Sequence, residues 1–308
     1  DFGLPDQWRT LDAAEAKEMV GAEGVLGGLC TEHCALVHPG KLVRGLAGLV
    51  ESMGAVIYER TPALSVAPRT VTTPSGKLTA PVVVRATEAF ACQQPGHDRS
   101  VIPLFSLVLA TEPLPAATRA ALNLDHRRAF NDMRHLRVYS QVTADGRLVF
   151  GGRGAPYRFG SNLASSNAAA AAMHEKIRAT MIEFFPALRD VKVTHRWGGA
   201  LGVARDWCPS VGLDPATGLA WAGQYVGDGV ATSNLAGRLL RNLILQRDEE
   251  INTLPLVNHR SPLWEREPFR WLGVNFGLTA ASIGDAEERL TSRPSHVAHV
   301  LETLTGAH

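Results

Sequence analysis

The most constraining feature of the sequence is a glycine-rich turn that leads directly into an amphipathic helix. Residues 223–229 hold three glycines and the acid Asp228, and apolar side chains then recur at helical spacing through residues 230–244. Glycine permits a positive φ, and a helix N-terminus presents free N–H groups with a partial positive charge. The pattern predicts a helix start that can face a negatively charged ligand, although an ordinary capped surface helix would look the same.

Length and charge exclude several classes of protein. The 308 residues allow one large domain or two ordinary ones, and 45% hydrophobic with 20% charged residues is typical of globular proteins. With 31 basic and 30 acidic residues the net charge is +1, which gives no field to attract nucleic acid or an anionic membrane. No apolar run approaches the roughly 18 residues of a membrane span, and no signal-peptide pattern opens the chain. We expect small molecules or other proteins as partners.

The cysteines do not form a disulfide framework, because there are only four in the chain. This favours a reducing, cytoplasmic compartment. Cys30, His33, Cys34 and His38 fall within nine residues, a density seen at zinc sites, but their spacing matches no common zinc motif. We expect no metal here and interpret the group as buried thiols beside a histidine at a helix start, with zinc as the alternative.

Hydrophobic periodicity predicts an α/β region in the first part of the chain. Apolar residues at helical spacing predict one helix over 12–20, which Asp12 can cap, and another over 39–53, which Gly54 ends. The predicted strands cover residues 55–58, 70–73 and 81–86. The last contains Val82, Val83 and Val84, a run typical of a strand covered on both faces. The helices at 39–53 and 230–244 are expected to provide that cover.

The composition changes after about Gln94, where an antiparallel sheet with a covering helix is predicted. Its strands are expected at 101–111, 135–143 and 147–153, the last two joined by a turn at Ala144-Asp145-Gly146. An alanine-rich helix follows, which Ser165 or Ser166 caps and Pro186 stops. A short helix near residues 284–290 is expected in the tail.

Three further segments share a resemblance with the glycine-rich turn. Together with residues 223–240, the runs at 37–46, 57–62 and 195–199 resemble the D-amino-acid-oxidase-like FAD-dependent oxidoreductases, with most likeness to the γ-glutamylputrescine oxidase branch. The resemblance spans most of residues 1 to 275 and implies a two-domain α+β/α/β fold. It implies an FAD-binding domain from residues 1–95 and 196–245, a substrate domain from 96–195, and a C-terminal tail from 246–308.

One element of that family is absent from the sequence. Members open with a βαβ unit whose G-x-G-x-x-G turn binds the FAD pyrophosphate at a helix N-terminus. The glycines at 21, 24, 27 and 28 lack this spacing, as do those at 151, 152 and 154. We therefore expect the chain to be the larger, C-terminal part of a flavoenzyme or the product of a truncated gene.

The resemblance also implies which residues meet the cofactor. The helix start at Gly227–Ala231 would face the N1–C2=O edge of the flavin, where a helix dipole stabilises developing negative charge. Trp197, Gly198 and Gly199 would pass the flavin on a strand. The complete set implied to bind FAD is Ala63, Leu64, Ala86, Thr87, Trp197, Gly198, Gly199, Gly223, Gly227, Asp228, Gly229, Val230 and Ala231.

Two side chains are candidates for the catalytic site. Tyr225 would place its ring beside the flavin and exclude water, although a core tyrosine is an equal alternative. Arg153 would pair with a substrate carboxylate, although a solvated arginine at a strand end is equally compatible. Both belong to segments expected to face the flavin, so we expect them to line one cavity.

Two functions are therefore compatible with the sequence. In the first, the protein oxidises a C–N bond of an amine or amino acid by hydride transfer to flavin N5, and oxygen or another acceptor reoxidises the flavin. Such chemistry needs no protein base, in keeping with the absence of a Ser-His-Asp or paired-carboxylate pattern. In the second, the chain is a non-catalytic remnant, or a subunit that needs a partner to bind the cofactor.

Overall fold

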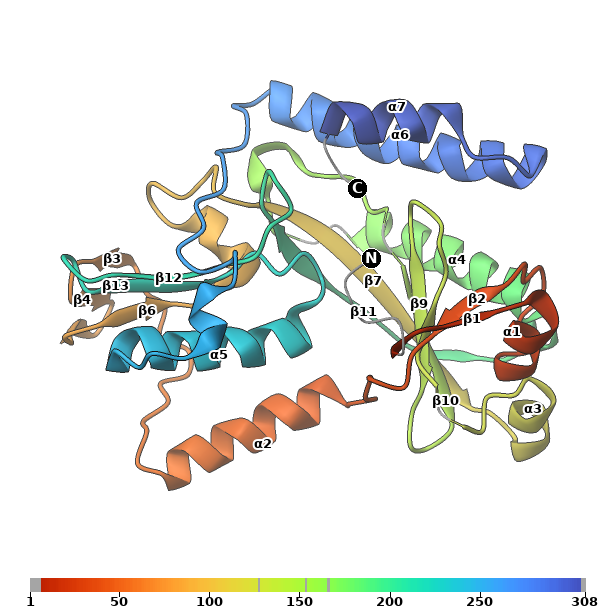
Figure 1. Ribbon diagram of the computed structural model, residues 1–308, viewed down its shortest axis with the longest axis horizontal. Helices are drawn as coiled ribbons and strands as arrows, with labels where there is room; N and C mark the ends of the chain where they lie inside the picture. Colours follow the sequence, from red (N-terminus) through yellow and green to blue (C-terminus); the bar gives the residue numbers. More distant parts are fainter. Residues whose placement is uncertain (1–6, 127, 153, 165–166, 306–308) are drawn as a thin grey trace. The chain divides into compact units, whose positions relative to one another are not determined.

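The computed structural model describes residues 7–126, 128–152, 154–164 and 167–305, and they form two compact units (Figure 1). Unit 1 comprises Asp1–Val43, Ser106–Ala155 and Ser165–Gly199, and unit 2 comprises Arg44–Phe105, Pro156–Ala164 and Ala200–His308. These boundaries differ from the domain limits expected from the sequence. The assignment of one part to the cofactor and another to the substrate stays a prediction.

Most of unit 1 is an antiparallel sheet in the order β11-β7-β10-β9-β8, of which the first residues of β7 and the last of β11 are assigned to unit 2. Its strands are β7 (Ile102–Pro113), β8 (Phe130–Asn131), β9 (Val138–Val142), β10 (Arg147–Gly152) and β11 (Val193–Val203). The predicted hairpin is confirmed, since β9 pairs with β10 and Gly146 takes a φ of +80° in the turn between them. Glycine adopts this backbone conformation without steric cost.

A single apolar core joins this sheet to the alanine-rich helix α4 (Asn167–Phe184). Its fully buried members include Leu109, Leu148, Phe150, Met181 and Phe185. The predicted helix is confirmed, and it gives way at Pro186 to the 3₁₀ helix η4 (Pro186–Leu188). Its expected caps, Ser165 and Ser166, lie outside the described residues.

Smaller elements complete unit 1. The helix α1 (Ala13–Met19) begins as predicted at Asp12, whose carboxylate accepts the Glu15 N–H while the Glu15 carboxylate accepts the Asp12 N–H. This reciprocal capping box satisfies two otherwise free N–H groups. No local pattern predicted the short strand β8, nor β1 (Arg9–Leu11), β2 (Gly28–Cys30) and α3 (Ala116–Ala121).

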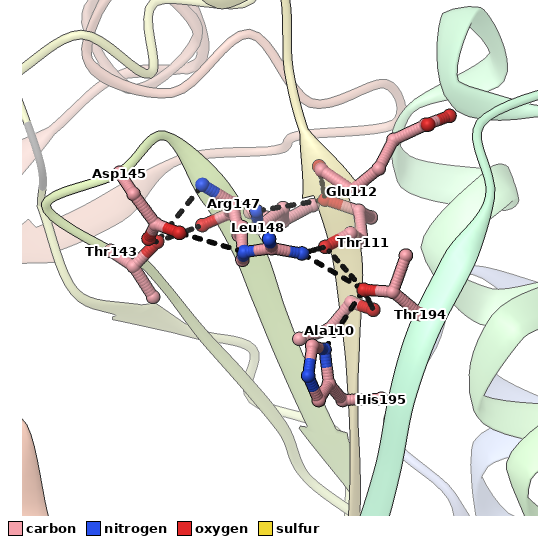
Figure 2. Close-up of polar contacts among 9 residues, drawn as sticks. All are labelled: Ala110, Thr111, Glu112, Thr143, Asp145, Arg147, Leu148, Thr194 and His195. Atoms are coloured by element: carbon pink, nitrogen blue, oxygen red, sulfur yellow. Dashed lines mark hydrogen bonds and ion pairs between the residues drawn. The ribbon is translucent and has the colours of Figure 1, made fainter.

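A polar clip on Arg147 fixes the start of β10 against β7 and β11 (Figure 2). The guanidinium donates to the Thr111 carbonyl at 3.0 Å, to the Thr194 hydroxyl at 2.9 Å and to the Asp145 carboxylate at 2.8 Å. The Thr143 hydroxyl and the Arg147 side chain lower the pKa of Asp145 to about 2. One side chain thus joins the hairpin turn to β7 and to β11, which lies beyond β7 in the sheet.

Unit 2 contains two three-stranded sheets. The first, in the order β12-β13-β6, consists of β12 (Ser210–Asp214), β13 (Leu219–Gly223) and β6 (Val83–Arg85). β12 pairs antiparallel with β13, and β13 pairs parallel with β6. The second is the meander β3 (Ser65–Ala67), β4 (Thr70–Thr73) and β5 (Gly76–Thr79). The helix α5 (Gly229–Leu245) forms as predicted and packs on β12 and β13 (Figure 1).

The predicted strand at 81–86 is present as β6, but the prediction that other elements cover both of its faces is wrong. Val83 is buried, whereas Val84 is exposed. The helix α2 (Pro39–Ser52) forms where predicted, yet none of its residues is buried, so it does not cover this strand. Its apolar side chains, together with that of Met53 just after the helix, are between 39% and 78% exposed. They belong to Leu42, Val43, Leu46, Leu49, Val50 and Met53.

The segment at 55–58 is not a strand, contrary to the expectation. Val56, Ile57 and Tyr58 are exposed, and no described segment pairs with them as a neighbouring strand. An apolar run becomes a strand only when a partner completes its backbone hydrogen bonds. Residues 55–58 are apolar, as the sequence pattern indicated, but they lack the neighbouring strand that a β-strand requires.

The C-terminal part is more helical than expected. The helix predicted near 284–290 is the end of α6 (Phe269–Thr291), which packs on α7 (His296–Thr305) (Figure 1). Hydrogen bonds of Glu267 link the start of α6 to the 3₁₀ helix η3 (Phe159–Ser161) and to Tyr157, which precedes that helix. Its carboxylate accepts the Tyr157 hydroxyl at 2.9 Å, the Gly160 N–H at 2.9 Å and the Arg270 guanidinium at 3.1 Å. Another 3₁₀ helix, η5 (Glu250–Thr253), follows α5.

Candidate functional site

Glu88 connects three distant segments of unit 2 at the end of β6. It opens the 3₁₀ helix η2 (Glu88–Gln93) and has a φ of +46°, which is unusual for a residue with a side chain. One carboxylate oxygen accepts the Gly202 N–H at 3.0 Å and the Tyr225 N–H at 3.3 Å, while the other accepts the Gln224 N–H at 2.7 Å. The carboxylate therefore positions the loop that precedes α5.

Two glycines make this approach possible. A Cβ atom on Gly202 or on Gly223 would lie 3.0 Å from a Glu88 carboxylate oxygen, a tighter contact than side chains normally make. Burial raises the pKa of Glu88, and its three backbone hydrogen bonds act in the opposite direction. Burial, with the Glu88 charge, raises the pKa of Tyr225 to about 12. The phenol hydroxyl thus keeps its proton throughout the neutral range.

The N-terminus of α5 has no side-chain cap. Asp228 occupies the capping position, but its side chain makes no capping hydrogen bond among the described residues, and the preceding Gly227 has a φ of +105°. The two nearby hydroxyls, of Thr232 and Ser233, donate to backbone carbonyls. The first-turn N–H groups from Gly229 to Ala231 accordingly remain available to an anionic group, since the described residues supply no side-chain acceptor for them.

The other predicted cofactor residues of unit 2 lie next to the ends of its strands. Ala86 is exposed and follows β6, while the Thr87 hydroxyl is buried without a hydrogen-bond partner among the described residues. Ala63 and Leu64 are exposed just before β3, where the Leu64 N–H donates to the Thr72 carbonyl at 2.8 Å. Thr87 and Gly223 line one cavity of about 30 Å³, enough for one or two water molecules.

The predicted residues Trp197, Gly198 and Gly199 lie on β11 in unit 1. Trp197 is 46% exposed, and its carbonyl accepts the buried His174 ring at 3.1 Å. A Cβ on Gly198 would lie 2.2 Å from the Leu107 side chain, so glycine here serves the close approach of β11 to β7. Arg153 lies outside the described residues, and its expected place in one cavity with Tyr225 stays a prediction.

The cysteine cluster is not the buried group expected from the sequence. Cys34 is exposed and Cys30 is partly exposed, and both are free thiols. Among the residues that the structure describes, no three His, Cys, Asp or Glu side chains gather in a way that could hold a metal ion. His38 does mark a helix start, because its Nδ1 accepts the Lys41 N–H at 3.2 Å at the beginning of α2.

Sequence reasoning missed the charged residues around the cavity. Glu88 directly follows the predicted pair Ala86 and Thr87, and an acid inside a run of small residues is a signal that could have singled it out. Arg85, which also lines the cavity, ends the valine-rich strand. Trp221 faces Arg85 across the β13–β6 pair, a register that no local pattern reveals.

The comparison with protein families decides what the chain is. Residues 1–243 match the family model described as DAO, FAD dependent oxidoreductase. The chain belongs to the DAO family of FAD-dependent oxidoreductases. The match includes the Glu88 site and most of α5, and it ends before the C-terminal helices α6 and α7.

Named relatives of this DAO-family chain are longer proteins. It is 30% identical over 252 residues to the probable oxidoreductase OrdL of Rhizobium meliloti, covering 79% of this chain and 55% of that protein. It is 26% identical over 279 residues to the gamma-glutamylputrescine oxidoreductase of Escherichia coli, covering 88% and 63%. The chain thus spans between 55% and 63% of the length of these relatives.

Solved structures support the DAO fold. The glycine oxidase of Geobacillus kaustophilus superimposes with a TM-score of 0.69 at 21% identity, covering 83% of this chain and 67% of that one. The L-proline dehydrogenase of P. horikoshii superimposes with a TM-score of 0.67 at 19% identity, covering 81% and 67%. No described helix of the DAO-family chain is long and apolar enough to cross a membrane.

Proposed function

We propose that this DAO-family chain serves the FAD-dependent oxidation of a C–N bond in an amine or amino acid. The name of one relative, gamma-glutamylputrescine oxidoreductase, specifies an amine substrate. Two similar structures are named a glycine oxidase and an L-proline dehydrogenase, which act on amino acids. The substrates in these names share a nitrogen on the carbon to be oxidised, which supports this reaction class.

One observation carries the proposal, namely the uncapped start of α5 behind a loop that Glu88 holds. Bound FAD would accept a hydride at its N5 and gain negative charge at the N1–C2=O edge. The N–H groups of Gly229, Val230 and Ala231 have no side-chain acceptor among the described residues and fit such an edge. A helix terminus stabilises a nearby negative charge by about 0.3–2 kcal/mol, and direct hydrogen bonds in a dry site add to this.

The remaining residues would orient the cofactor and exclude water. Tyr225 keeps its hydroxyl proton at neutral pH and is partly buried, which suits a wall that shapes the space for an amine. Ala63 and Leu64 would meet the adenine end through backbone groups, and Ala86 and Thr87 would line the groove between. Gly223 leaves room for Glu88, which positions the loop. Trp197, Gly198 and Gly199 would belong to the strand that passes the flavin.

We assign Arg153 the substrate carboxylate, because a guanidinium pairs with it through two parallel hydrogen bonds. An Arg153→Lys variant keeps the charge but loses the second bond. It should raise the KM of carboxylated substrates more than that of simple amines, as measured by steady-state oxidation of a matched pair of substrates. Equal effects on both would reject the carboxylate role.

A second candidate function is that of a subunit completed by another polypeptide segment. β6 pairs with β13 on one side, and no described strand pairs with its other edge. Parallel strands are normally buried within a sheet. The exposed apolar side chains of α2 give independent support for a missing partner.

Titration of FAD into the purified 308-residue chain separates the two functions. Without a G-x-G-x-x-G turn, several charge-assisted hydrogen bonds to the pyrophosphate are lost, each worth roughly 1.5–3 kcal/mol. We expect a colourless protein that binds added FAD with a Kd above micromolar, since each 1.4 kcal/mol is a factor of about ten. At saturating FAD, anaerobic addition of γ-glutamylputrescine, glycine or proline should bleach the flavin absorbance.

The outcomes of this titration are distinct. Submicromolar binding would overturn the expected weak affinity, and bound FAD that no amine reduces would reject amine oxidation. Absence of binding at millimolar FAD would favour the second candidate. A Gly227→Ala variant, strained at a φ of +105°, should weaken FAD binding, whereas Gly54→Ala, strained at +95° in open space, is the matched control.

A further inference from the structure

The helix α6 carries a continuous stripe of exposed, mostly apolar side chains. They recur at alternating intervals of three and four residues, the a and d spacing of a helix that packs along another helix. Phe269 and Phe276 are 71% and 67% exposed, and Leu272 and Ile283 are 53% and 52% exposed. The α6 seam comprises six exposed residues, Phe269, Leu272, Phe276, Thr279, Ile283 and Ala286.

The opposite face of α6 is fixed to the rest of unit 2. The Arg270 guanidinium donates to the Asp98 carbonyl at 2.9 Å, and the Asn275 side-chain amide donates to the Tyr157 carbonyl at 3.0 Å. Val274 packs against the buried apolar cluster that contains Tyr157. The helix also packs on α7 (Figure 1). Unit 2 therefore holds α6 in place and leaves the seam exposed.

The area of the seam matches a modest protein interface. A phenylalanine side chain offers roughly 200 Å² of surface, so the four large side chains leave on the order of 500 Å² exposed in each copy of the chain. A patch of a few hundred Å² is typical of an interaction site. Two such patches together reach about 1,000 Å², the lower limit for a specific interface, and suit a reversible association with a Kd on the order of micromolar.

The charges of α6 do not suit a membrane surface. Helices that lie on anionic membranes carry lysine and arginine on their polar face. The α6 sequence contains no lysine and two arginines, against the three acids Asp285, Glu287 and Glu288. A second protein helix is consequently a better occupant of the seam than a lipid headgroup layer.

The order of large and small side chains along the seam favours a second copy of this chain. When two α6 helices run in opposite directions about a twofold axis near residues 277 and 278, each phenylalanine faces a small side chain, which fills the space evenly. Parallel helices would instead place each phenylalanine against its own counterpart and align the two helix dipoles unfavourably. The facing pairs of the antiparallel arrangement are Phe269 with Ala286, Leu272 with Ile283, and Phe276 with Thr279.

We propose that two copies of this chain associate through an antiparallel, twofold pair of α6 seams. An interface of this kind uses the same surface on both copies and is closed, so association stops at the dimer. The seam lies beyond residue 243, where the family match ends, and contains none of the residues proposed to meet FAD or the amine. The inference thus goes beyond the proposed oxidation, and either can fail while the other stands.

Sedimentation velocity over a range of protein concentrations tests the association. We expect a reversible monomer–dimer equilibrium in which Leu272→Glu raises the Kd at least tenfold, because it brings a carboxylate into an apolar interface. Leu49→Glu is the matched control, since Leu49 is 55% exposed and lies on α2, another helix with an exposed apolar face. This variant should leave the Kd within twofold.

Two results would overturn the proposal. One is a wild-type chain that stays monomeric at every concentration, and the other is a dimer that Leu49→Glu weakens as strongly as Leu272→Glu. Circular dichroism checks that both variants fold. If Leu272→Glu does not fold, Phe276→Ser takes its place, because that ring is 67% exposed in the single chain. An unchanged Kd in Phe276→Ser would then reject the seam.

A double variant tests the antiparallel orientation. Leu272 and Ile283 lie about 16 Å apart along one helix, so charges at the two positions cannot pair within a chain. In the antiparallel dimer they face each other, and Leu272→Glu combined with Ile283→Lys should associate at least threefold more tightly than either single variant. Association no tighter than that of the single variants would overturn the proposed pairing.

Co-sedimentation with vesicles of phosphatidylcholine and phosphatidylglycerol tests a lipid surface as the occupant. We expect the wild-type chain to remain in the supernatant, because the charges of α6 give no attraction to the anionic lipid. A monomeric chain that binds these vesicles, and loses the binding in Leu272→Glu, would assign the seam to a membrane and reject the second copy.

Discussion

The central sheets of the two units differ in how far their faces are buried and their edge strands are paired. In unit 1, the five-stranded sheet and α4 enclose a core that includes fully buried aromatic and aliphatic side chains. In unit 2, the β12-β13-β6 sheet has three strands, α5 packs on two of them, and β6 ends the sheet with an unpaired edge among the described residues. Unit 1 therefore derives its stability from apolar burial, whereas unit 2 leaves backbone and charged groups that a ligand or partner can satisfy.

The largest effect is expected when an apolar side chain is removed from the core of unit 1. The comparison is removal of an exposed apolar side chain from α2. Phe150→Ala, at a position with no exposed surface in unit 1, should lower the free energy of unfolding by about 3–5 kcal/mol. Leu46→Ala, on the exposed face of α2, should change it by less than about 0.5 kcal/mol. Urea denaturation followed by circular dichroism measures both. A large loss for Leu46→Ala would mean that α2 is covered in solution, and the contrast would fail.

A smaller effect is expected at Glu88, which stabilises unit 2 through polar bonds. In Glu88→Gln an NH₂ group replaces one carboxylate oxygen and meets a backbone N–H, which leaves a buried donor without an acceptor. The expected loss in the free energy of unfolding is about 1–3 kcal/mol. Glu88→Gly, which relieves the positive φ but removes every bond, is the companion variant in the same denaturation experiment. Stability unchanged in both variants would show that the carboxylate does not hold the loop.

The smallest effect concerns pH and the Arg147 clip of unit 1. The folded pKa of Asp145 is about 2, below its ordinary value near 4. The ionised carboxylate therefore stabilises the folded state above about pH 4, and this contribution disappears as the pH falls towards 2. Because the side chain is exposed, the slope should be shallow. Comparison of acid denaturation in the wild type and Asp145→Asn measures it, and identical profiles between pH 4 and 2 would contradict the assignment.

Local chemistry made several elements predictable from the sequence. The capping pair Asp12 and Glu15, the turn residue Gly146 and the glycine-rich entry to α5 each act within a few residues. The predictions of a strand at 55–58 and of α2 as the cover of β6 were wrong, because both depend on a neighbouring segment that periodicity does not report. The same reason hid Glu88 and Arg85, whose partners lie on segments that only the fold brings together.

Glu88 also bears on the order in which unit 2 folds. Its hydrogen bonds to Gly202, Gln224 and Tyr225 close loops of 114, 136 and 137 residues. Contacts of such sequence separation carry a large closure entropy and form slowly compared with local helices and hairpins. The Glu88 bonds should consequently be absent from the folding transition state, so that their loss accelerates unfolding and leaves the folding rate almost unchanged. The loop before α5 would then be the last part of unit 2 to become ordered during folding.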